Sequence, residues 1–283
     1  MNIILVGLCV ITLTVQSVFK KLFDGNCKSG QLTFSALVSL FALLVFLIIS
    51  KSADFTYAVI PYSVLFALCY ALTTVKSIFA LGCGSLAITS LIFSYSLIIP
   101  TFYGIIFWKE KIGLLQSVGI LALLISLFLV RGEADKEKRG ISAKWLIFVI
   151  ISFFTNGFCS VIQRQQQIEF SGKYDTCFMI YALAFAVIIL GAASVIFERK
   201  TVKQALKKGF ILSSVCGISN GLTNLLVLIC VAAIPASLFY PILSGGQLIL
   251  VFLISVILFK EKFLKRQLFG LFSGFIVILL MNI

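Results

Sequence analysis

The sequence predicts an all-α integral membrane fold in which ten transmembrane helices form two inverted five-helix repeats. The prediction comes from the composition, from the spacing of apolar segments and from a repeated sequence block. Hydrophobic residues make up 61% of the 283 residues, and charged residues make up 12%, about half the share found in soluble domains. Because a hydrocarbon core about 30 Å thick needs roughly 20 apolar residues per helix, most of this chain is expected to lie within a bilayer.

Charge clusters and Gly or Pro residues divide the chain into ten apolar segments of spanning length. The connections are mostly short, so consecutive helices are expected to run antiparallel. A polar linker at 131–143 separates a first five-helix repeat, 1–130, from a second, 144–283. The predicted spans are 2–19, 32–50, 57–80, 85–108, 112–130, 144–163, 176–197, 209–232, 236–259 and 265–282.

The two halves contain a repeated block. A shift of 151 residues aligns WKEKIGLLQSVG (108–119) with FKEKFLKRQLFG (259–270), and a weaker match at a shift of 143 aligns SVFKK (17–21) with SVIQR (160–164). Five spans are an odd number, so the second repeat must enter the membrane from the opposite side. Many transporters use such inverted repeats, with the substrate site near the midplane. The identical pairs in the first block are Lys109–Lys260, Glu110–Glu261, Lys111–Lys262, Gln116–Gln267 and Gly119–Gly270.

Basic residues give the chain a net charge of +13, but they stand in short clusters between apolar spans. We interpret the clusters as topology signals, and no nucleic acid is expected as a partner. The connections after spans one, five, seven and nine hold seventeen of the basic residues, Lys20 and Lys21 among them, whereas the opposite face holds five. The positive-inside rule then places both termini outside.

The segment SLAITSLIFSYSLIIPTFYGIIFWKEKIGLLQSVGILALLISLFLV (85–130) combines small residues, a mid-helix proline, a glutamate after the fourth helix, and a helix that opens with a spaced glutamine and glycine. Residues 236–281 repeat the pattern. In these features the chain resembles the drug/metabolite transporter superfamily, specifically its EamA-like ten-helix members. The resemblance covers essentially the whole chain. It departs from the family at ITLTVQS (11–17), where members commonly carry a tryptophan, and in the termini, which members commonly place inside.

The resemblance implies a secondary transporter, in particular an exporter, of a small metabolite such as an amino acid, working by alternating access. The compact chain, which has no cleaved signal, suits a plasma membrane, specifically a bacterial inner membrane. Two alternatives stay open at this point. One is broad-specificity efflux of lipophilic compounds through a cavity lined by some of the 28 phenylalanines, and the other is a membrane interaction module that transports nothing.

No arrangement of residues in the sequence suggests catalysis: it has no histidine, no Cys/His or Ser/His pairing and no phosphate-binding Gly-Lys loop. No enzyme activity, cofactor or metal site is therefore expected. All ten acidic residues fall in connections or at span ends, which disfavours a cation/proton antiporter and favours a neutral, zwitterionic or anionic substrate. The expected partners are the lipid bilayer and a small-molecule substrate, and a coupling ion is left open.

Lys76 is the one basic residue predicted to lie well inside a span. An ammonium in hydrocarbon costs at least about 2.5–3.5 kcal/mol, so a charge at that depth indicates function. Thr73 stands on the same face and Tyr70 lies nearby, so we expect these residues to bind a carboxylate or phosphate of the substrate. The alternative is that Lys76 extends its charge to the nearer interface.

Uncharged polar residues inside the spans complete the predicted binding set, because buried amides need partners. They are Gln16, Asn156, Gln163, Asn220, Asn224, Tyr240 and Gln247, with Ser94 and Tyr95. Kinks and small residues let helices open and close, so Pro100, Pro241, Gly245 and Gly246 are predicted hinge residues. Two GxxxG pairs are predicted to serve close helix packing, Gly217 with Gly221 and Gly270 with Gly274.

Overall fold

The computed structural model describes residues 2–27, 29–49, 54–84, 98–109 and 143–260, with positions 89, 92, 93 and 96 between them. Regular structure in this part of the chain is helical throughout. The predicted fifth and tenth spans, nearly all of the 131–143 linker and the pair Gly270 and Gly274 lie outside the described residues, as do Ser94 and Tyr95. The elements are α1 (Asn2–Asn26), α2 (Gln31–Ile49), the short 3-10 helix η1 (Tyr57–Val59), α3 (Ile60–Cys83), α5 (Ile98–Ile106), α7 (Ala143–Glu169), α8 (Asp175–Phe197), α9 (Val202–Ala233) and α10 (Ala236–Phe259).

Seven of the described helices are long and apolar enough to cross a membrane: α1, α2, α3, α7, α8, α9 and α10. Apolar side chains also cover their outer surface, where Ile188, Ile211 and Ile257 are each at least 65% exposed. A helix satisfies its own backbone hydrogen bonds, which hydrocarbon cannot do. The described part of the chain thus has the build of a multi-pass membrane protein.

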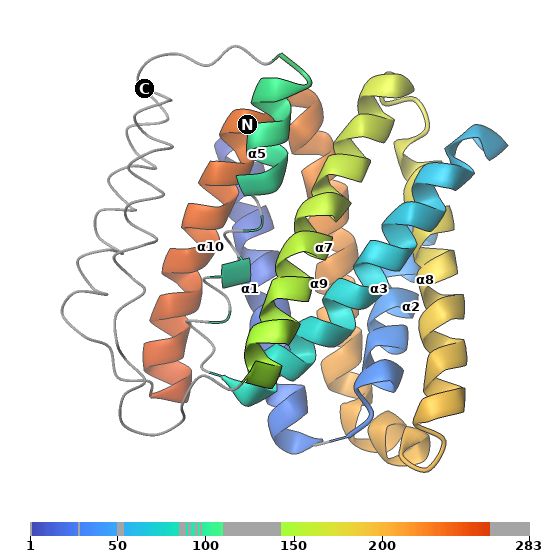
Figure 1. Cartoon of the computed structure of the whole chain (residues 1–283), viewed down its shortest axis with the longest axis vertical. Coiled ribbons are helices and arrows are strands. Elements are labelled where there is room, and N and C mark those ends of the chain that lie inside the picture. The colour runs from blue at the N-terminus through green and yellow to red at the C-terminus, as the bar shows by residue number, and fades with distance from the viewer. Residues whose placement is uncertain are drawn as a thin grey trace.

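The described helices lie side by side, roughly along the long axis of the molecule (Figure 1). α1 packs against α3, α9 and α10, and α2 packs against α8 and α9. α3 contacts α7 and α8, while α5 contacts α7 and α10. Helices from the first half of the chain therefore pack mainly on helices from the second half, and the two halves share one interior.

α1 is longer than predicted. Its expected end was residue 19, with Lys20 in the following connection, but the helix continues to Asn26. Lysine has a favourable helix propensity, and no Gly or Pro stands between residue 19 and Gly25. Lys20 consequently lies six residues inside the helix end, about 9 Å along the axis at 1.5 Å per residue. The prediction that Lys20 is a connection residue was wrong for this reason.

An aromatic cluster between α2, α3 and α8 fixes the orientation of α3. Phe46, Phe66 and Phe178 are at most 2% exposed, and the rings of Phe66 and Phe178 meet edge to face with centroids 5.5 Å apart. Phe66 also stacks on Tyr70 at 5.9 Å. Between membrane helices the stabilisation comes from such van der Waals packing, because lipid is as apolar as the side chains. The cluster therefore helps to hold Tyr70 in place on α3.

The turn between α1 and α2 is tied to the second half of the chain. Gly30 has a φ of 92°, and a Cβ at this position would lie 2.4 Å from the Cβ of Ala205, so conformation and space both require glycine. Glu198 accepts hydrogen bonds from the backbone N–H groups of Leu32 and Thr33, each at 2.9 Å. These groups belong to the first turn of α2, where a carboxylate is stabilised by the helix dipole. The end of α8 thereby caps the start of α2.

α2 and α9 approach each other closely at two glycines. A Cβ on Gly217 would lie 2.6 Å from the carbonyl oxygen of Val38, and one on Gly221 would lie 3.0 Å from that of Ala42. Both neighbouring atoms belong to the backbone of α2, which cannot move aside as a flexible side chain would. The absence of side chains at Gly217 and Gly221 thus sets the distance between these two helices.

Gly217→Ala is expected to destabilise the protein by about 1–3 kcal/mol, because the added methyl group overpacks the α2–α9 contact. The measurement is thermal unfolding of the detergent-purified protein. Gly191→Ala in α8 is the matched control, since a Cβ there has no neighbour within 4 Å and alanine favours the helix. Equal melting temperatures for the two variants would contradict the close contact.

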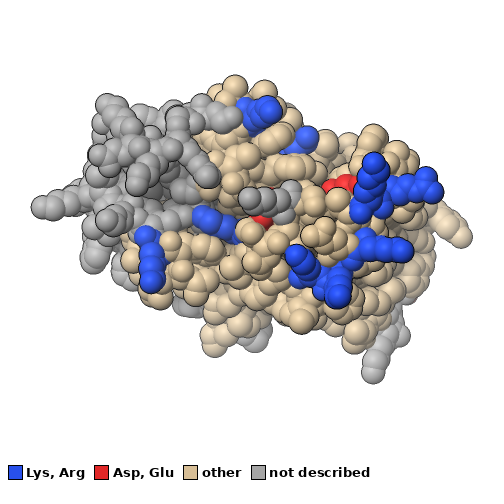
Figure 2. All heavy atoms as spheres, turned by 90° about the horizontal axis from the view of Figure 1, so that it is seen from below, with Lys and Arg blue, Asp and Glu red and all other residues tan. Residues whose placement is uncertain are grey.

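Basic side chains gather at one end of the bundle (Figure 2). At this end α1 finishes, α7 begins, α8 finishes and α9 begins. The exposed basic residues from these helix ends are Lys144, Arg199, Lys200, Lys203, Lys207 and Lys208. We refer to this end as the basic end. α1 starts at the opposite end, as the positive-inside prediction for the amino terminus requires.

Candidate functional site

A cavity of about 140 Å³ lies between α1, α3, α7, α9 and α10. It is large enough for several water molecules or a small organic solute. Fifteen of the 21 described residues that line it carry a polar or charged side chain, so this wall differs sharply from the lipid-facing surface. The lining residues are Leu13, Gln16, Ser17, Lys20, Phe66, Tyr70, Thr73, Thr74, Ser77, Phe93, Asn156, Cys159, Ser160, Gln163, Asn220, Thr223, Asn224, Val227, Tyr240, Leu243 and Gln247.

Eight of the nine residues predicted to bind substrate line this cavity. They come from all five helices, although no sequence motif links them. These residues are Gln16, Tyr70, Thr73, Asn156, Asn220, Asn224, Tyr240 and Gln247. Gln163, from the wider set of polar candidates, lines the cavity as well, whereas Lys76 does not.

Asn220 is the centre of a hydrogen-bond network that joins three helices. Its Oδ1 accepts from the hydroxyl of Tyr70 at 2.8 Å, and its Nδ2 donates to Gln16 Oε1 at 2.8 Å. Gln16 Nε2 in turn donates to Thr223 Oγ1 at 2.8 Å, and Thr223 donates to Thr12 at 2.7 Å. Buried amides are costly unless they are paired, and this network pairs those of α1 and α9 with each other.

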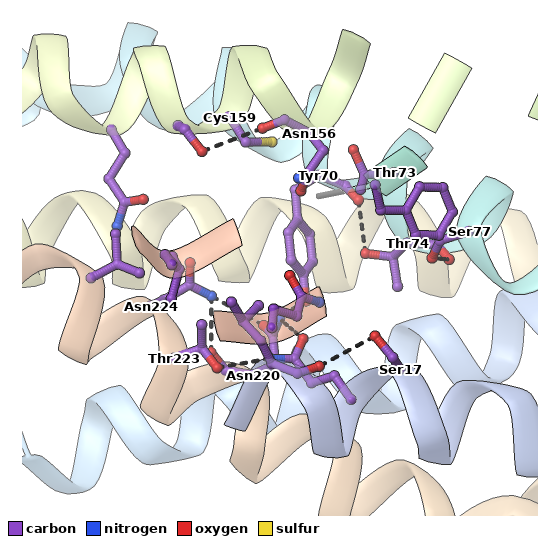
Figure 3. Close-up of a pocket in the computed structure, with 18 of the residues that line it drawn as sticks. Ser17, Tyr70, Thr73, Thr74, Ser77, Asn156, Cys159, Asn220, Thr223 and Asn224 are labelled. Carbon is purple, nitrogen blue, oxygen red and sulfur yellow. Dashed lines mark hydrogen bonds between the residues drawn. The ribbon is translucent and has the colours of Figure 1, made fainter. Parts of the chain in front are cut away.

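The α7 side of the cavity has its own polar contacts. Asn156 Nδ2 donates to Ser96 Oγ at 2.6 Å, and Thr73 Oγ1 of α3 donates to Thr155 Oγ1 at 2.7 Å. In Figure 3, Asn156 lies across the cavity from Asn220, and the ring of Tyr70 extends between the two sides. The Tyr70 side chain thus extends from α3 into the cavity, where it would contact a bound solute.

Lys20 brings the only positive charge among the described lining residues. Its Nζ donates to Ser77 Oγ at 3.2 Å. No described carboxylate forms an ion pair with it, and Asp24, one turn further along α1, accepts instead from Gln31 at 3.2 Å. An ammonium has three donors, so two of them have no acceptor in the part of the chain that the structure describes.

Lys76 points elsewhere. Successive residues of a helix are turned by about 100°, so Lys76 faces away from the direction of Ser77. Its Nζ lies 5.2 Å from the ring centroid of Phe148, near the start of α7 and hence toward the basic end. The geometry suits the alternative that Lys76 extends its charge to an interface. As the cavity's cation, Lys20 takes the place that the sequence suggested for Lys76.

Gln163 has an amide donor without a partner. The residue is only 5% exposed and lines the cavity from α7, and its Nε2 makes no hydrogen bond to any residue that the structure describes. A buried amide N–H without an acceptor costs about 1–3 kcal/mol. Such a group at the wall of a polar cavity is a ready donor for a ligand oxygen.

The predicted hinge residues lie within regular helix. α10 is continuous from Ala236 to Phe259 and contains Pro241, Gly245 and Gly246 without a break. A Cβ on Gly246 would lie 2.8 Å from a methyl group of Val10, so this glycine permits close packing on α1. Pro100 is buried in α5. Motion at these positions stays a prediction.

Lys20 was missed because two adjacent lysines were interpreted as the end of a span. A usable signal was present: Lys20 stands three and four residues after Ser17 and Gln16, on the same helical face. The alignment of SVFKK with SVIQR also matches Lys20 to Gln163, a residue assigned to a span. The position of Lys20 on the helical face thus predicts its location better than the pair of adjacent lysines does.

The described lining contains no aspartate or glutamate. Within the described residues, His, Cys, Asp and Glu form no group of three suited to a metal ion. The groups that the cavity offers are amides, hydroxyls and one ammonium. Such groups are able to bind and orient a polar solute through hydrogen bonds.

No family model matches this chain, and no curated protein sequence matches it. Its fold is matched by 28 chains of solved structures. One of them, described as "Crystal structure of protein", has a TM-score of 0.70 and 12% sequence identity over 98% of this chain and 94% of that chain. At this identity the likeness concerns the fold alone.

Asn220→Leu is expected to lower stability by about 1–3 kcal/mol, because it removes the partners of the Tyr70 hydroxyl and of Gln16 Oε1. Asn224→Leu is the matched control, since its amide donates only to Asn220 of the same helix. Thermal unfolding in detergent measures both. In addition, Tyr70→Phe should cost clearly less in the Asn220→Leu background than in the wild type. Fully additive effects would contradict the network.

Proposed function

We propose that this chain is a secondary transporter of a small polar solute, built from two inverted five-helix repeats and related to the EamA-like drug/metabolite transporters. The observation that carries the proposal is the polar cavity enclosed by five helices of a multi-pass membrane protein. Polar groups inside a membrane bundle are costly and mark solute pathways. Alternating access would come from rocking one repeat against the other, with a plasma membrane, specifically a bacterial inner membrane, as the proposed location.

The repeat relation is supported by which residues line the cavity. On α1 these are positions 13, 16, 17 and 20, and a shift of 143 gives 156, 159, 160 and 163, which are the lining positions of α7. On α3, positions 70, 73, 74 and 77 become 220, 223, 224 and 227 at a shift of 150, the lining positions of α9. Phe66 of α3 has no such counterpart. Corresponding helices thus present corresponding faces to the cavity.

The pairing of helices supports the same relation. Exchanging the halves turns the α1–α9 contact into α7–α3, and α2–α9 into α8–α3, all of which occur. Direction agrees too: Lys20, near the end of α1, contacts Ser77 near the end of α3, while Trp145, at the start of α7, lies against Gly84 just after α3. α1 and α7 therefore run in opposite directions, as an inverted repeat demands.

The alternatives fit this cavity less well. Efflux of lipophilic compounds needs a mainly apolar wall, yet of the 28 phenylalanines only Phe66 and Phe93 are among the described lining residues. An interaction module that transports nothing has no use for an internal chamber of amides and hydroxyls. A neutral, zwitterionic or anionic metabolite is the proposed cargo, and export is the proposed direction.

Alternating access predicts that cavity positions face each side of the membrane in turn. Ser17→Cys and Ser160→Cys, placed singly in a background whose eight cysteines are replaced, should both react with a membrane-impermeant thiol reagent in right-side-out and in inside-out vesicles. Both serines line the cavity and correspond under the 143-residue shift. The measurement is the fraction of thiol modified, and it needs no knowledge of the substrate.

Ser35→Cys serves as the control, because Ser35 is fully buried in α2 and does not line the cavity. It should stay unmodified from both sides. Modification of Ser17→Cys or Ser160→Cys from one side alone would contradict alternating access and favour a static module.

A further inference from the structure

The lining positions of the two halves correspond almost one to one, and among these corresponding pairs only Lys20 and Gln163 differ in formal charge. Lys20 on α1 corresponds to Gln163 on α7, and each lies six residues before the end of its helix. Because α1 and α7 run in opposite directions, these two positions belong to opposite ends of the cavity. One end therefore carries an ammonium and the other a neutral amide.

The ammonium of Lys20 lacks a counter-charge in the described structure. Ser77 accepts one of its hydrogen bonds, and no described carboxylate pairs with it or lines the cavity. A charge removed from water is stabilised only by an opposite charge and further hydrogen bonds. The missing partner is thus an anion that brings its own charge into the cavity.

The number of charges limits what that anion is. A monoanion beside Lys20 gives a neutral pair, whereas a dianion would leave one negative charge uncompensated in a medium of low dielectric constant. The ammonium of a zwitterion would find only neutral acceptors, since no aspartate or glutamate lies in the described lining. Two free N–H donors on Lys20 suit the two oxygens of a carboxylate.

Gln163 is the residue that would contact the end of the ligand far from Lys20. Its Nε2 is buried and unpaired, so it offers a hydrogen bond to a neutral oxygen such as a hydroxyl or carbonyl. From these two groups, and resting on the transport function proposed above, we infer that the cavity binds a small monocarboxylate. The ligand's carboxylate pairs with Lys20, and a neutral oxygen at its far end accepts a hydrogen bond from Gln163.

The test uses isosteric probes that differ in charge. Hydroxy acids of three to six carbons, such as 4-hydroxybutyrate, are compared with the matching amides, such as 4-hydroxybutyramide, and the matching amino acids, such as 4-aminobutyrate. Dissociation constants are measured by thermal stabilisation of the detergent-purified chain. At least one hydroxy acid should bind at least about tenfold more tightly than its amide and its amino acid.

Two variants assign the charge to Lys20. Lys20→Gln gives α1 the residue that α7 carries at the corresponding position, and it should weaken hydroxy-acid binding at least about tenfold while amide binding stays constant. Lys76→Gln removes a cation that does not line the cavity and should bind like the wild type. Gln163→Leu should weaken binding of 4-hydroxybutyrate more than that of butyrate, which lacks the far oxygen.

Several outcomes would overturn the inference: amino acids or amides that bind as tightly as the hydroxy acids, equal behaviour of Lys20→Gln and Lys76→Gln, or no hydroxy acid that binds the folded wild type. The melting temperature without ligand verifies that each variant is folded. None of these outcomes depends on the thiol accessibility of Ser17→Cys and Ser160→Cys, which is measured without a ligand. Failure of the ligand class is therefore distinguishable from failure of the transport function.

Discussion

The hydrogen bond from Asn220 to Gln16 is the contact on which the interior of this bundle depends. Asn220 is 9% exposed and Gln16 is 5% exposed, so neither amide is well placed to turn to bulk water instead. An unpaired amide would cost about 1–3 kcal/mol, and pairing the two across α1 and α9 avoids that cost. The same pair orients Tyr70 through Asn220, so one polar contact both joins the halves and shapes the cavity wall.

Close packing and the polar network together join α9 to three helices of the first half of the chain. The glycine contacts of α9 bring it against the backbone of α2, and Asn220 connects α9 to α1 and α3. Such a group resists deformation, because tightly packed interfaces shift between discrete arrangements rather than bending continuously. On the proposed mechanism, rocking one repeat against the other therefore requires the contacts of α9 with α1, α2 and α3 to change together.

Seven of the predicted spans are long apolar helices in the described structure, and eight of the nine residues predicted to bind substrate line the cavity. The binding residues were predictable for one physical reason. Amides in hydrocarbon are expensive, so Gln16, Asn156 and Asn220 stood out as residues with a purpose. Depth alone could not say which way a side chain points, and so Lys76 was chosen in place of Lys20. Thr74 and Ser77 gave no signal at all, because each hydroxyl also donates to a carbonyl of its own helix and costs little inside a span.

On the proposed function, a cavity whose lining positions correspond between two halves binds a molecule that is not symmetric. Duplicated halves give similar walls, so a polar end and a charged end of a ligand can be told apart only where corresponding residues differ, as Lys20 and Gln163 do. On the proposed function, the charge of Lys20 would also link ligand binding to the change of access. Without a ligand, a change of access would carry an uncompensated ammonium through a region of low dielectric constant, which is unfavourable. On the proposed mechanism a bound monoanion removes this penalty, so the ligand-bound protein would change its access more readily than the empty protein.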